Sequence, residues 1–329
     1  AGIDNIFLET FYQGYTIFPS KTMQQYGLTA QRQEFQGWDP LKEWIKEAHS
    51  RGMKVHVWFQ AFYVGNEDVT KTPGHILYSY PEWANVQRKN AKASAPQPSK
   101  SEHNGYFIDP ANSMARTFLL SLISEIATNY NVDGFNIDYV RYPKSLDKNF
   151  PNYYDSTWGY TVTARSYFKG NYGVDPVDID ENHDLWQNWV EDRQNYITEF
   201  VSALKSAIGN RNILLSAVIF PDAENIEETK LQKWREWCNY GYVDAVTPLI
   251  MSSDEARAGY AVSEIRKLVG DRVSIYPGLF EPFTYGSPVD LLNQVIAIRQ
   301  SGAKGFVIFD KAHLDEKFTR ALSARVLRN

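Results

Sequence analysis

Four acidic residues stand where short apolar segments of this sequence end, which is where an α/β barrel places its functional groups. They are Glu9, Asp138, Glu281 and Asp310. Two carboxyl groups that flank a glycosidic bond can cleave it, with retention when they lie about 5–5.5 Å apart and with inversion at about 6.5–9.5 Å. Asp138 is our candidate for the first member of such a pair, and Glu281, Asp310 and Glu9 are candidates for the second.

The segment around Asp138, residues 134–143 (GFNIDYVRYP), is the most informative one. Alternate side chains of a strand point to the same side, so Asn136 and Asp138 are expected to share one side. Arg141 either contacts the substrate or keeps Asp138 ionised, because a nearby arginine lowers a carboxylate's pKa. The alternative is that Asp138 only holds Arg141 and caps a loop, just as Asp310 could cap a helix.

Aromatic residues are frequent, with 9 Trp, 21 Tyr and 18 Phe, and several stand where loops leave the apolar segments. Their flat faces can stack on sugar rings while polar neighbours bind the hydroxyl groups. Most aromatic side chains of a protein nevertheless pack in the core or anchor loops. The predicted substrate-binding residues are Tyr12, Tyr15, Trp58, Gln60, Asn136, Tyr139, Arg141 and Tyr142.

Charge and hydropathy exclude two kinds of partner. The 34 Lys and Arg against 39 Asp and Glu give a net charge of −5, so no overall positive field attracts nucleic acid. No apolar stretch approaches the roughly 20 residues of a membrane-spanning helix. We therefore expect a polysaccharide or oligosaccharide partner, no nucleic acid and no membrane span.

Several catalytic motifs are missing from the sequence. The six histidines form no HxH or HExxH pattern, and the single cysteine, Cys238, cannot form a CxxC site or an internal disulfide. GxSxG, GxGxxG and GxxxxGK[ST] do not occur either, which disfavours a Ser-His-Asp triad and the common nucleotide-binding loops. We predict no metal site and no cofactor.

Seven apolar, β-rich segments alternate with amphipathic stretches of helical periodicity, which predicts an α/β protein with a parallel sheet. A closed (β/α)8 TIM barrel and an open doubly wound sheet both fit this alternation, and the missing nucleotide-binding motifs favour the barrel. The predicted strands lie at residues 3–9, 54–60, 134–139, 213–220, 243–250, 273–279 and 305–310. Since a barrel needs eight strands, and Ala1-Gly2 looks like the end of a helix, we expect a first strand and helix to be missing from this chain.

The chain is predicted to be one barrel over residues 1–329, with long insertions at about 61–112 and 144–183. Both insertions follow predicted strands, so they should wall the functional face of the barrel. Residues 91–101, rich in alanine, serine, lysine and proline, are predicted to be an exposed, flexible tip of the first insertion.

Residues 133–143 (DGFNIDYVRYP) carry a family resemblance. They are similar to the DG-x-x-x-D-[DY]-x-x-YP pattern of the bacterial glycosyl hydrolase-like family 10, in which an aspartate often stands at the position of Tyr139. Further matches, in the same order as in the family, span nearly the whole chain: GYTIFPS at 14–20, DPL at 39–41, HSRGMKVHVWF at 49–59 and DPAN at 109–112. The resemblance implies a (β/α)8 barrel, glycosidase activity and an extracytoplasmic location in bacteria.

Together these observations predict a glycoside hydrolase that uses a carboxylate pair including Asp138. The slightly acidic balance favours neutral or amino-sugar glycans of the bacterial envelope, peptidoglycan strands among them. The first alternative is a carbohydrate-binding barrel that holds glycan in the same aromatic cleft without catalysis. The second is a barrel enzyme of different chemistry, such as a lyase or a metal-assisted hydrolase.

Overall fold

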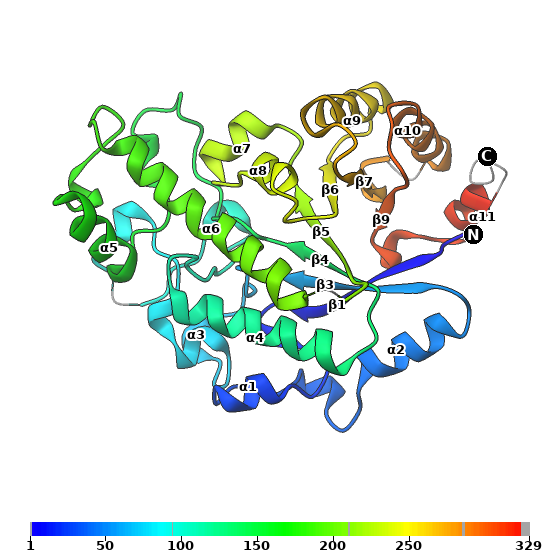
Figure 1. The fold of residues 1–329 in the computed structure, drawn as a ribbon, viewed down its shortest axis with the longest axis horizontal. Coiled ribbons are helices and arrows are strands. Elements are labelled where there is room, and N and C mark those ends of the chain that lie inside the picture. Colours follow the sequence, from blue (N-terminus) through cyan, green and yellow to red (C-terminus); the bar gives the residue numbers. More distant parts are fainter. Residues whose placement is uncertain (1, 94, 210, 285–286, 324–329) are drawn as a thin grey trace.

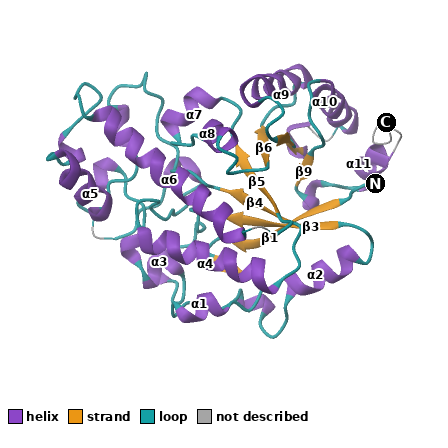
Figure 2. Ribbon diagram, in the orientation of Figure 1, coloured by secondary structure: helices purple, strands orange, loops and turns teal. Residues whose placement is uncertain are grey.

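The computed structural model describes residues 2–93, 95–209, 211–284 and 287–323, which form a parallel sheet covered by helices (Figures 1 and 2). Its strands follow the order β2-β1-β3-β4-β5-β6-β8-β9, with β7 also paired to β6. Every pairing is parallel except the β1–β2 hairpin. The strands are β1 (Asn5–Tyr12), β2 (Tyr15–Thr16), β3 (Lys54–Gln60), β4 (Gly134–Asp138), β5 (Leu214–Ile219), β6 (Ala245–Ile250), β7 (Ser274–Ile275), β8 (Gly278–Phe280) and β9 (Val307–Phe309).

All seven predicted strands are confirmed, and one of them is divided. The segment 273–279 forms β7 and β8, with Pro277 between them. Proline has no backbone N–H to donate to a neighbouring strand, so it interrupts the pairing with β6. The carbonyl of Pro277 still accepts the N–H of Val307 at 2.9 Å, which helps to hold β9 in place.

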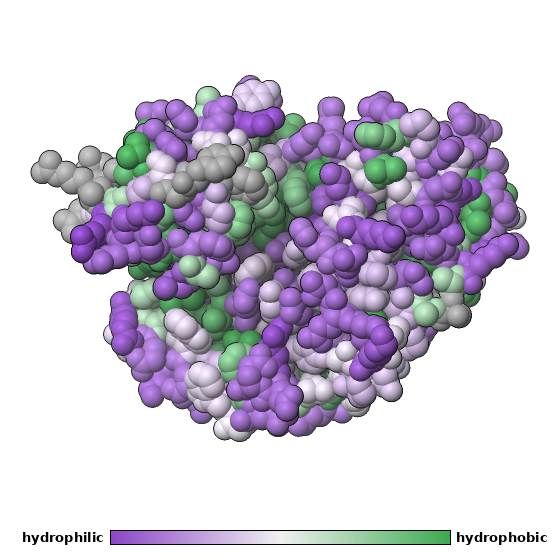
Figure 3. All heavy atoms as spheres, turned by 180° about the vertical axis from the view of Figure 1, so that it is seen from behind, coloured by the Kyte–Doolittle hydropathy of each residue, from purple (hydrophilic) through white to green (hydrophobic). Residues whose placement is uncertain are grey.

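The sheet curls but does not close in the described part of the chain. β1 and β9 are its two parallel edges, and among the described residues they are not paired with each other. Val55 and Phe135 of the inner strands are fully buried, whereas Leu8 and Ile308 of the edge strands are only partly buried. Figure 3 shows a recess with apolar side chains on its walls on the face seen from behind. The α/β prediction is confirmed, while the described residues form a curled parallel sheet rather than a closed barrel.

The helices run between successive strands, as predicted, and their ends follow local rules. Asp39 accepts the N–H of Lys42 and Pro40 occupies the first turn of α2, both of which are common at a helix start. The helices are α1 (Lys21–Gln25), α2 (Pro40–His49), α3 (Ile76–Ser79), α4 (Ser113–Asn129), α5 (Val162–Tyr172), α6 (Trp186–Ile208), α7 (Ala223–Thr229), α8 (Trp234–Asn239), α9 (Glu255–Val269), α10 (Pro288–Gln300) and α11 (Glu316–Ser323).

The two insertions are folded on the sheet. The second carries α5 and packs with the first turns of α6 in a separate apolar cluster that includes Tyr160, Phe168 and Trp189. The first runs through short helical turns, and within it the prediction of an exposed tip at 91–101 is wrong for Pro96 and Ser99, which are buried. The end of this stretch is held because Ser99 and Gly105 pair through their backbones.

The β1–β2 hairpin offers a stability test at Gly14. Gln13 and Gly14 both have positive φ (51° and 80°), as a two-residue type I′ turn requires, and a Cβ on Gly14 would lie 2.8 Å from Nε2 of His75. Gly37 has a φ of 82° and no atom within 4 Å of such a Cβ. Both alanine variants carry backbone strain of order 1–3 kcal/mol, and Gly14→Ala adds the clash, so urea unfolding should show the larger stability loss for Gly14→Ala. Equal losses would show that His75 moves aside freely.

Candidate active site

The side chain of Asp138 lies at the carboxyl end of β4 and is only partly buried. Its carboxylate accepts two hydrogen bonds, from the indole Nε1 of Trp58 at 3.1 Å and from the backbone N–H of Tyr139 at 2.6 Å. Trp58 is in the right place because β3 and β4 pair in parallel, with Trp58 opposite Asn136 and Gln60 opposite Asp138. Tyr139 has a φ of 50°, a conformation that non-glycine residues rarely adopt, so the chain turns sharply after Asp138.

Burial and hydrogen bonding oppose each other at Asp138. Burial raises the pKa of this carboxyl above its usual range, while the Tyr139 N–H, the Arg141 guanidinium, the Trp58 indole and the Lys230 ammonium each lower it. These donors and cations all favour the carboxylate over the acid. Burial outweighs them, so the pKa stays above its usual range, and the two hydrogen bonds stabilise the negative charge that a nucleophile or a general base carries.

Glu9 lies on β1, which β3 separates from β4, and its side chain is exposed although neighbouring atoms cover part of it. Glu9 stands opposite Trp58 of β3, and the register between the two strands shifts between Glu9 and Phe11. β1 continues to Tyr12 instead of ending at Glu9 as predicted. Partial burial raises the pKa of Glu9, Asp310 raises it further, and Arg32 lowers it. A raised pKa favours the protonated form that a general acid needs.

Asp310 directly follows β9, and its carboxylate is already engaged. Oδ1 accepts the N–H of Ala312 at 2.9 Å and lies 2.8 Å from Nδ1 of His313. It thus caps the 3-10 helix η9 (Lys311–His313), as one of the two sequence interpretations allowed. Glu281, the other candidate, begins the 3-10 helix η8 (Glu281–Thr284) and is buried, with 6% of its surface exposed.

Four of the predicted substrate-binding residues are partly exposed at the carboxyl ends of the strands. The rings of Tyr12 and Trp58 lie 6.4 Å apart, and Trp58 reaches Asp138 through its indole nitrogen. Tyr15 follows the hairpin turn next to Tyr12, and Tyr139 follows Asp138. The partly exposed rings of Tyr12, Tyr15 and Trp58 can contact a ligand, whereas the ring of Tyr139 is already stacked on Tyr63 and covered by Arg141. These residues are Tyr12, Tyr15, Trp58 and Tyr139.

The other four are buried and have protein partners. Asn136 donates to Oγ of Ser216 at 2.8 Å and to Oγ1 of Thr247 at 3.1 Å, which forms a polar layer between the strands. Gln60 accepts the N–H of Gln13 at 3.0 Å and so holds the β1–β2 turn. The hydroxyl of Tyr142, which is only 1% exposed, donates to Oδ1 of Asp109 at 3.2 Å. These residues are Gln60, Asn136, Arg141 and Tyr142, and they contact other parts of the protein from buried positions.

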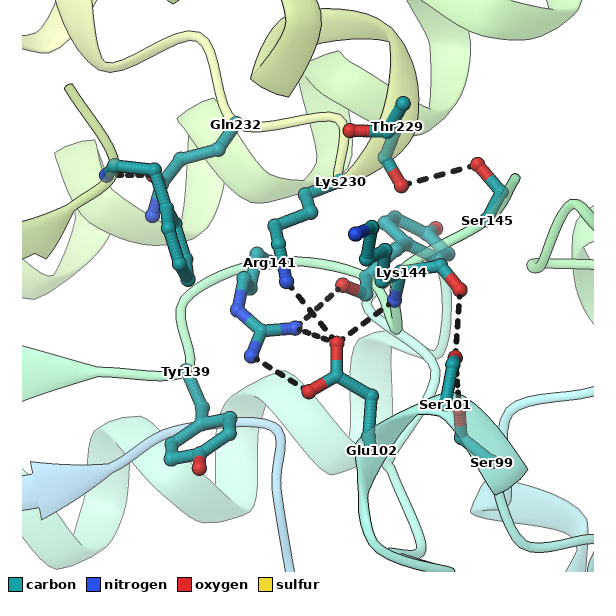
Figure 4. A network of polar contacts seen from close by, with 12 residues as sticks. Ser99, Ser101, Glu102, Tyr139, Arg141, Lys144, Ser145, Thr229, Lys230 and Gln232 are labelled. Carbon is teal, nitrogen blue, oxygen red and sulfur yellow. Dashed lines mark hydrogen bonds and ion pairs between the residues drawn. The ribbon is translucent and has the colours of Figure 1, made fainter. Parts of the chain in front are cut away.

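Three charged residues that the sequence did not single out lie at this face. The guanidinium of Arg32 lies 5.0 Å from the ring centroid of Tyr12 and 5.8 Å from that of Tyr15. Glu102 and Lys230 form ion pairs with each other, and Glu102 also pairs with Arg141 (Figure 4). Each of the three stands in a loop without a recognisable motif, so composition and spacing carry no signal for them. Their positions depend on the way distant loops meet.

Two features are absent from the described residues. Among them, no group of three or more histidine, cysteine, aspartate or glutamate side chains is placed to hold a metal ion. Within the same ranges, no helix combines the length and hydropathy that crossing a bilayer requires.

The hydrogen bond from Trp58 to Asp138 can be tested with Trp58→Phe. Because the indole stabilises the carboxylate, its removal should raise the pKa of Asp138 by about one unit, as expected for a hydrogen bond to a charged group. A carboxylate with a higher pKa is protonated at a higher pH, so the acidic limb of a pH–rate profile that depends on ionised Asp138 should move to higher pH. An acidic limb at the wild-type position in Trp58→Phe would contradict this role.

Comparison with solved structures supports the fold class. The chain resembles the PgaB (BpsB) glycoside hydrolase domain from Bordetella bronchiseptica, with a TM-score of 0.68 and 16% identity over 97% of this chain and 87% of that one. It also resembles α-L-fucosidase isoenzyme 2 from Paenibacillus thiaminolyticus, with a TM-score of 0.60 and 12% identity over 99% of this chain and 44% of that one. At these identities the likeness concerns the fold alone, which this chain shares with both proteins.

Comparison of sequences identifies the family within this class. The model of the family described as glycosyl hydrolase-like 10 matches residues 2–281, so the chain belongs to that family and the sequence resemblance is confirmed. The glycosyl hydrolase DigH of Escherichia coli (strain K12) is 26% identical over 156 residues, which cover 44% of this chain and 32% of that protein. The glycosyl hydrolase YngK of Bacillus subtilis (strain 168) is 26% identical over 120 residues, 35% of this chain and 21% of that protein. The matches thus span a third or less of these relatives.

Proposed function

We propose that this protein is a glycoside hydrolase in which Asp138 acts as the ionised carboxylate. The observation that carries the proposal is the pair of hydrogen bonds, from Trp58 and from the Tyr139 backbone, that converges on a carboxylate at a strand end. In an enzyme of this kind, such a carboxylate attacks the anomeric carbon or activates the water that does so. The family and the fold support the same reaction class.

Glu9 is our choice for the general acid. Its pKa is raised by partial burial and by Asp310 against the effect of Arg32, so Glu9 keeps its proton to a higher pH than an ordinary glutamate does. That proton passes to the glycosidic oxygen as the bond from this oxygen to the anomeric carbon breaks, and a water molecule finally supplies the hydroxyl group of the new reducing end. Asp310 already accepts from Ala312 and contacts His313, and Glu281 is buried, so both are weaker candidates.

The proposed substrate is a polysaccharide of the bacterial envelope or its surroundings. Tyr12, Tyr15, Trp58 and Tyr139 provide partly exposed rings beside the two carboxyl groups, which suits a sugar chain. The net charge of −5 favours neutral or amino-sugar glycans, including peptidoglycan strands, over strongly anionic polymers. The proposed extracytoplasmic setting follows from family membership.

The test is reducing-end release from a panel of envelope glycans, including chitooligosaccharides and peptidoglycan strands without peptides. Mass spectrometry of the products identifies the bond that is cut, and proton NMR of the first anomer formed distinguishes retention from inversion. We expect the wild-type protein to cut at least one amino-sugar glycan. Failure to cut any member of the panel under conditions in which the folded protein binds one would contradict the hydrolase proposal.

The second candidate function is glycan binding without catalysis. It is favoured by Tyr139, which stands where the family pattern often has a second aspartate and whose ring stacks on Tyr63 at 4.5 Å. A non-catalytic protein would bind the same glycans with equal affinity before and after Asp138→Asn, and neither form would release reducing ends.

A further inference from the structure

Glu102 connects the loops that follow three neighbouring strands. It ends the 3-10 helix η5 (Lys100–Glu102) in the insertion after β3. Its carboxylate accepts from Nη1 and Nη2 of Arg141 at 2.9 and 3.2 Å, from Nζ of Lys230 at 3.1 Å and from the backbone N–H of Lys144 at 3.0 Å (Figure 4). Arg141 and Lys144 belong to the loop after β4, and Lys230 to the loop after β5.

Burial distinguishes these contacts from ordinary surface ion pairs. The side chains of Arg141, Lys230 and Glu102 are 5%, 7% and 12% exposed. The two cations also face aromatic rings, since Nζ of Lys230 lies 4.4 Å from the ring centroid of Phe220 and the Arg141 guanidinium lies 4.8 Å from that of Tyr139. Water screens such charges weakly, so they act on their neighbours more strongly than surface charges do.

The triad formed by Glu102, Arg141 and Lys230 has two cations and one anion. One positive charge is therefore not compensated within it. Both cations favour the ionised form of Asp138, the residue directly before Tyr139. The triad adjoins Asp138 in the chain, because Arg141 belongs to the loop that follows Asp138 and its guanidinium lies against the ring of Tyr139, the next residue.

We propose, on the basis of the function proposed above, that Glu102 and Lys230 are positioning residues for Asp138. Glu102 fixes Lys230 beside Phe220 and Arg141 beside Tyr139, and the net positive charge of the triad favours the ionised form of Asp138 against the opposing effect of burial. Neither residue contacts Asp138 through a hydrogen bond that the structure shows, so both act through charge and through the placement of Arg141.

The protonation states of the triad are consistent with this role. Burial alone would raise the pKa of Glu102, but Arg141 and Lys230 outweigh it and hold that pKa at about 2. Burial and Arg141 lower the pKa of Lys230 to about 7 against the opposing effect of Glu102, so Lys230 is charged throughout the acidic range. Lys144 adds positive charge beside Lys230, and Tyr139 remains neutral because burial raises the pKa of its phenol.

The indole of Trp58 provides a readout of Asp138 that needs no substrate. Its Nε1–H donates to the carboxylate, so its proton and nitrogen chemical shifts should follow the ionisation of Asp138 in a pH titration by NMR. The signal is assigned by its loss in Trp58→Phe. Lys230→Gln keeps a donor for Glu102 but removes the charge, and we expect it to move the inflection up by about one pH unit.

Two further variants separate charge from packing. Lys230→Arg preserves the charge and should keep the wild-type inflection. The double variant Glu102→Gln/Lys230→Gln leaves Arg141 alone with one net positive charge, so its inflection should return toward the wild-type value although more contacts are lost. Circular dichroism and thermal unfolding establish that each variant is folded.

An unchanged inflection in folded Lys230→Gln would overturn the proposal. So would a double variant whose inflection moves as far as that of Lys230→Gln or further, because packing alone would then explain the shift. These outcomes are independent of glycan cleavage: shifts in the expected directions without turnover would refute the hydrolase proposal and leave the role of the triad standing. With turnover, the acidic limb of kcat/KM should follow the same shifts.

Discussion

Replacing Asp138 with asparagine is expected to lower kcat by about a thousandfold or more, as loss of a reacting carboxylate does in other enzymes. Asparagine has nearly the same shape, and its one amide oxygen can still accept from Trp58 or from the Tyr139 N–H. It cannot carry the negative charge that attacks the anomeric carbon or removes a proton from water. Binding of the glycan, measured by calorimetry, should therefore remain while reducing-end release disappears.

Asp133→Asn is the matched control. Asp133 stands just before β4, at the opposite end of the same strand, where Oδ2 accepts the N–H of Val55 and contacts Nε2 of His49, both at 2.8 Å. An amide oxygen can replace one of these contacts, so we expect a modest loss of stability and near wild-type turnover. Equal losses of turnover in the two variants would show that any aspartate next to this strand matters for folding, and would remove the basis for assigning the reaction to Asp138.

Glu9→Gln is expected to lower turnover of a natural glycan by about 10²–10⁴-fold, the usual contribution of a general acid. The loss should be much smaller for aryl glycosides with acidic leaving groups, because these depart without a proton. Since the raised pKa keeps Glu9 protonated to a higher pH than an ordinary glutamate, wild-type activity should fall as the pH rises through that pKa. This alkaline limb should be absent in Glu9→Gln, and a pH series of kcat/KM with both kinds of substrate measures it.

Asp310→Asn and Glu281→Gln complete the comparison. Asp310 raises the pKa of Glu9, so Asp310→Asn should move the alkaline limb to lower pH while keeping the dependence on the leaving group that the wild-type protein shows. Glu281 is buried, and its variant should affect stability more than turnover of activated substrates. If Asp310→Asn instead removes the alkaline limb, and its loss of turnover becomes small with substrates that have good leaving groups, Asp310 is the general acid and our choice of Glu9 is wrong.

The sheet could be predicted from the sequence because its signals are local. Each of the seven apolar segments has the length and composition of a buried strand, and Asp39-Pro40 marks a helix start through its own side chains. The division of residues 273–279 follows from Pro277. Closure of the sheet could not be predicted in this way, because it depends on pairing between two edge strands that are far apart in the sequence.

The candidate site was predictable only where chemistry and strand position coincide. Asp138 and Glu9 follow from the rule that polar side chains gather at the carboxyl ends of strands. The same rule selected Asn136, and the aromatic residues at loop starts included Tyr142. The structure buries these two against Ser216 and Asp109, because sequence alone cannot show how deep a side chain sits. Glu102 was missed since it lies at residue 102, far along the chain from its partners at 141 and 230.

The single carboxylate of Glu102 has a consequence for protein engineering. Loops on a barrel-like sheet are commonly treated as exchangeable parts, each grafted without its neighbours. Here a graft of the loop after β3 alone would bury Arg141 and Lys230 without their counter-ion, and a graft of either of the other two loops would leave Glu102 without one of its cations. The three loops form one unit of design, so altered specificity is best sought by transplanting them together.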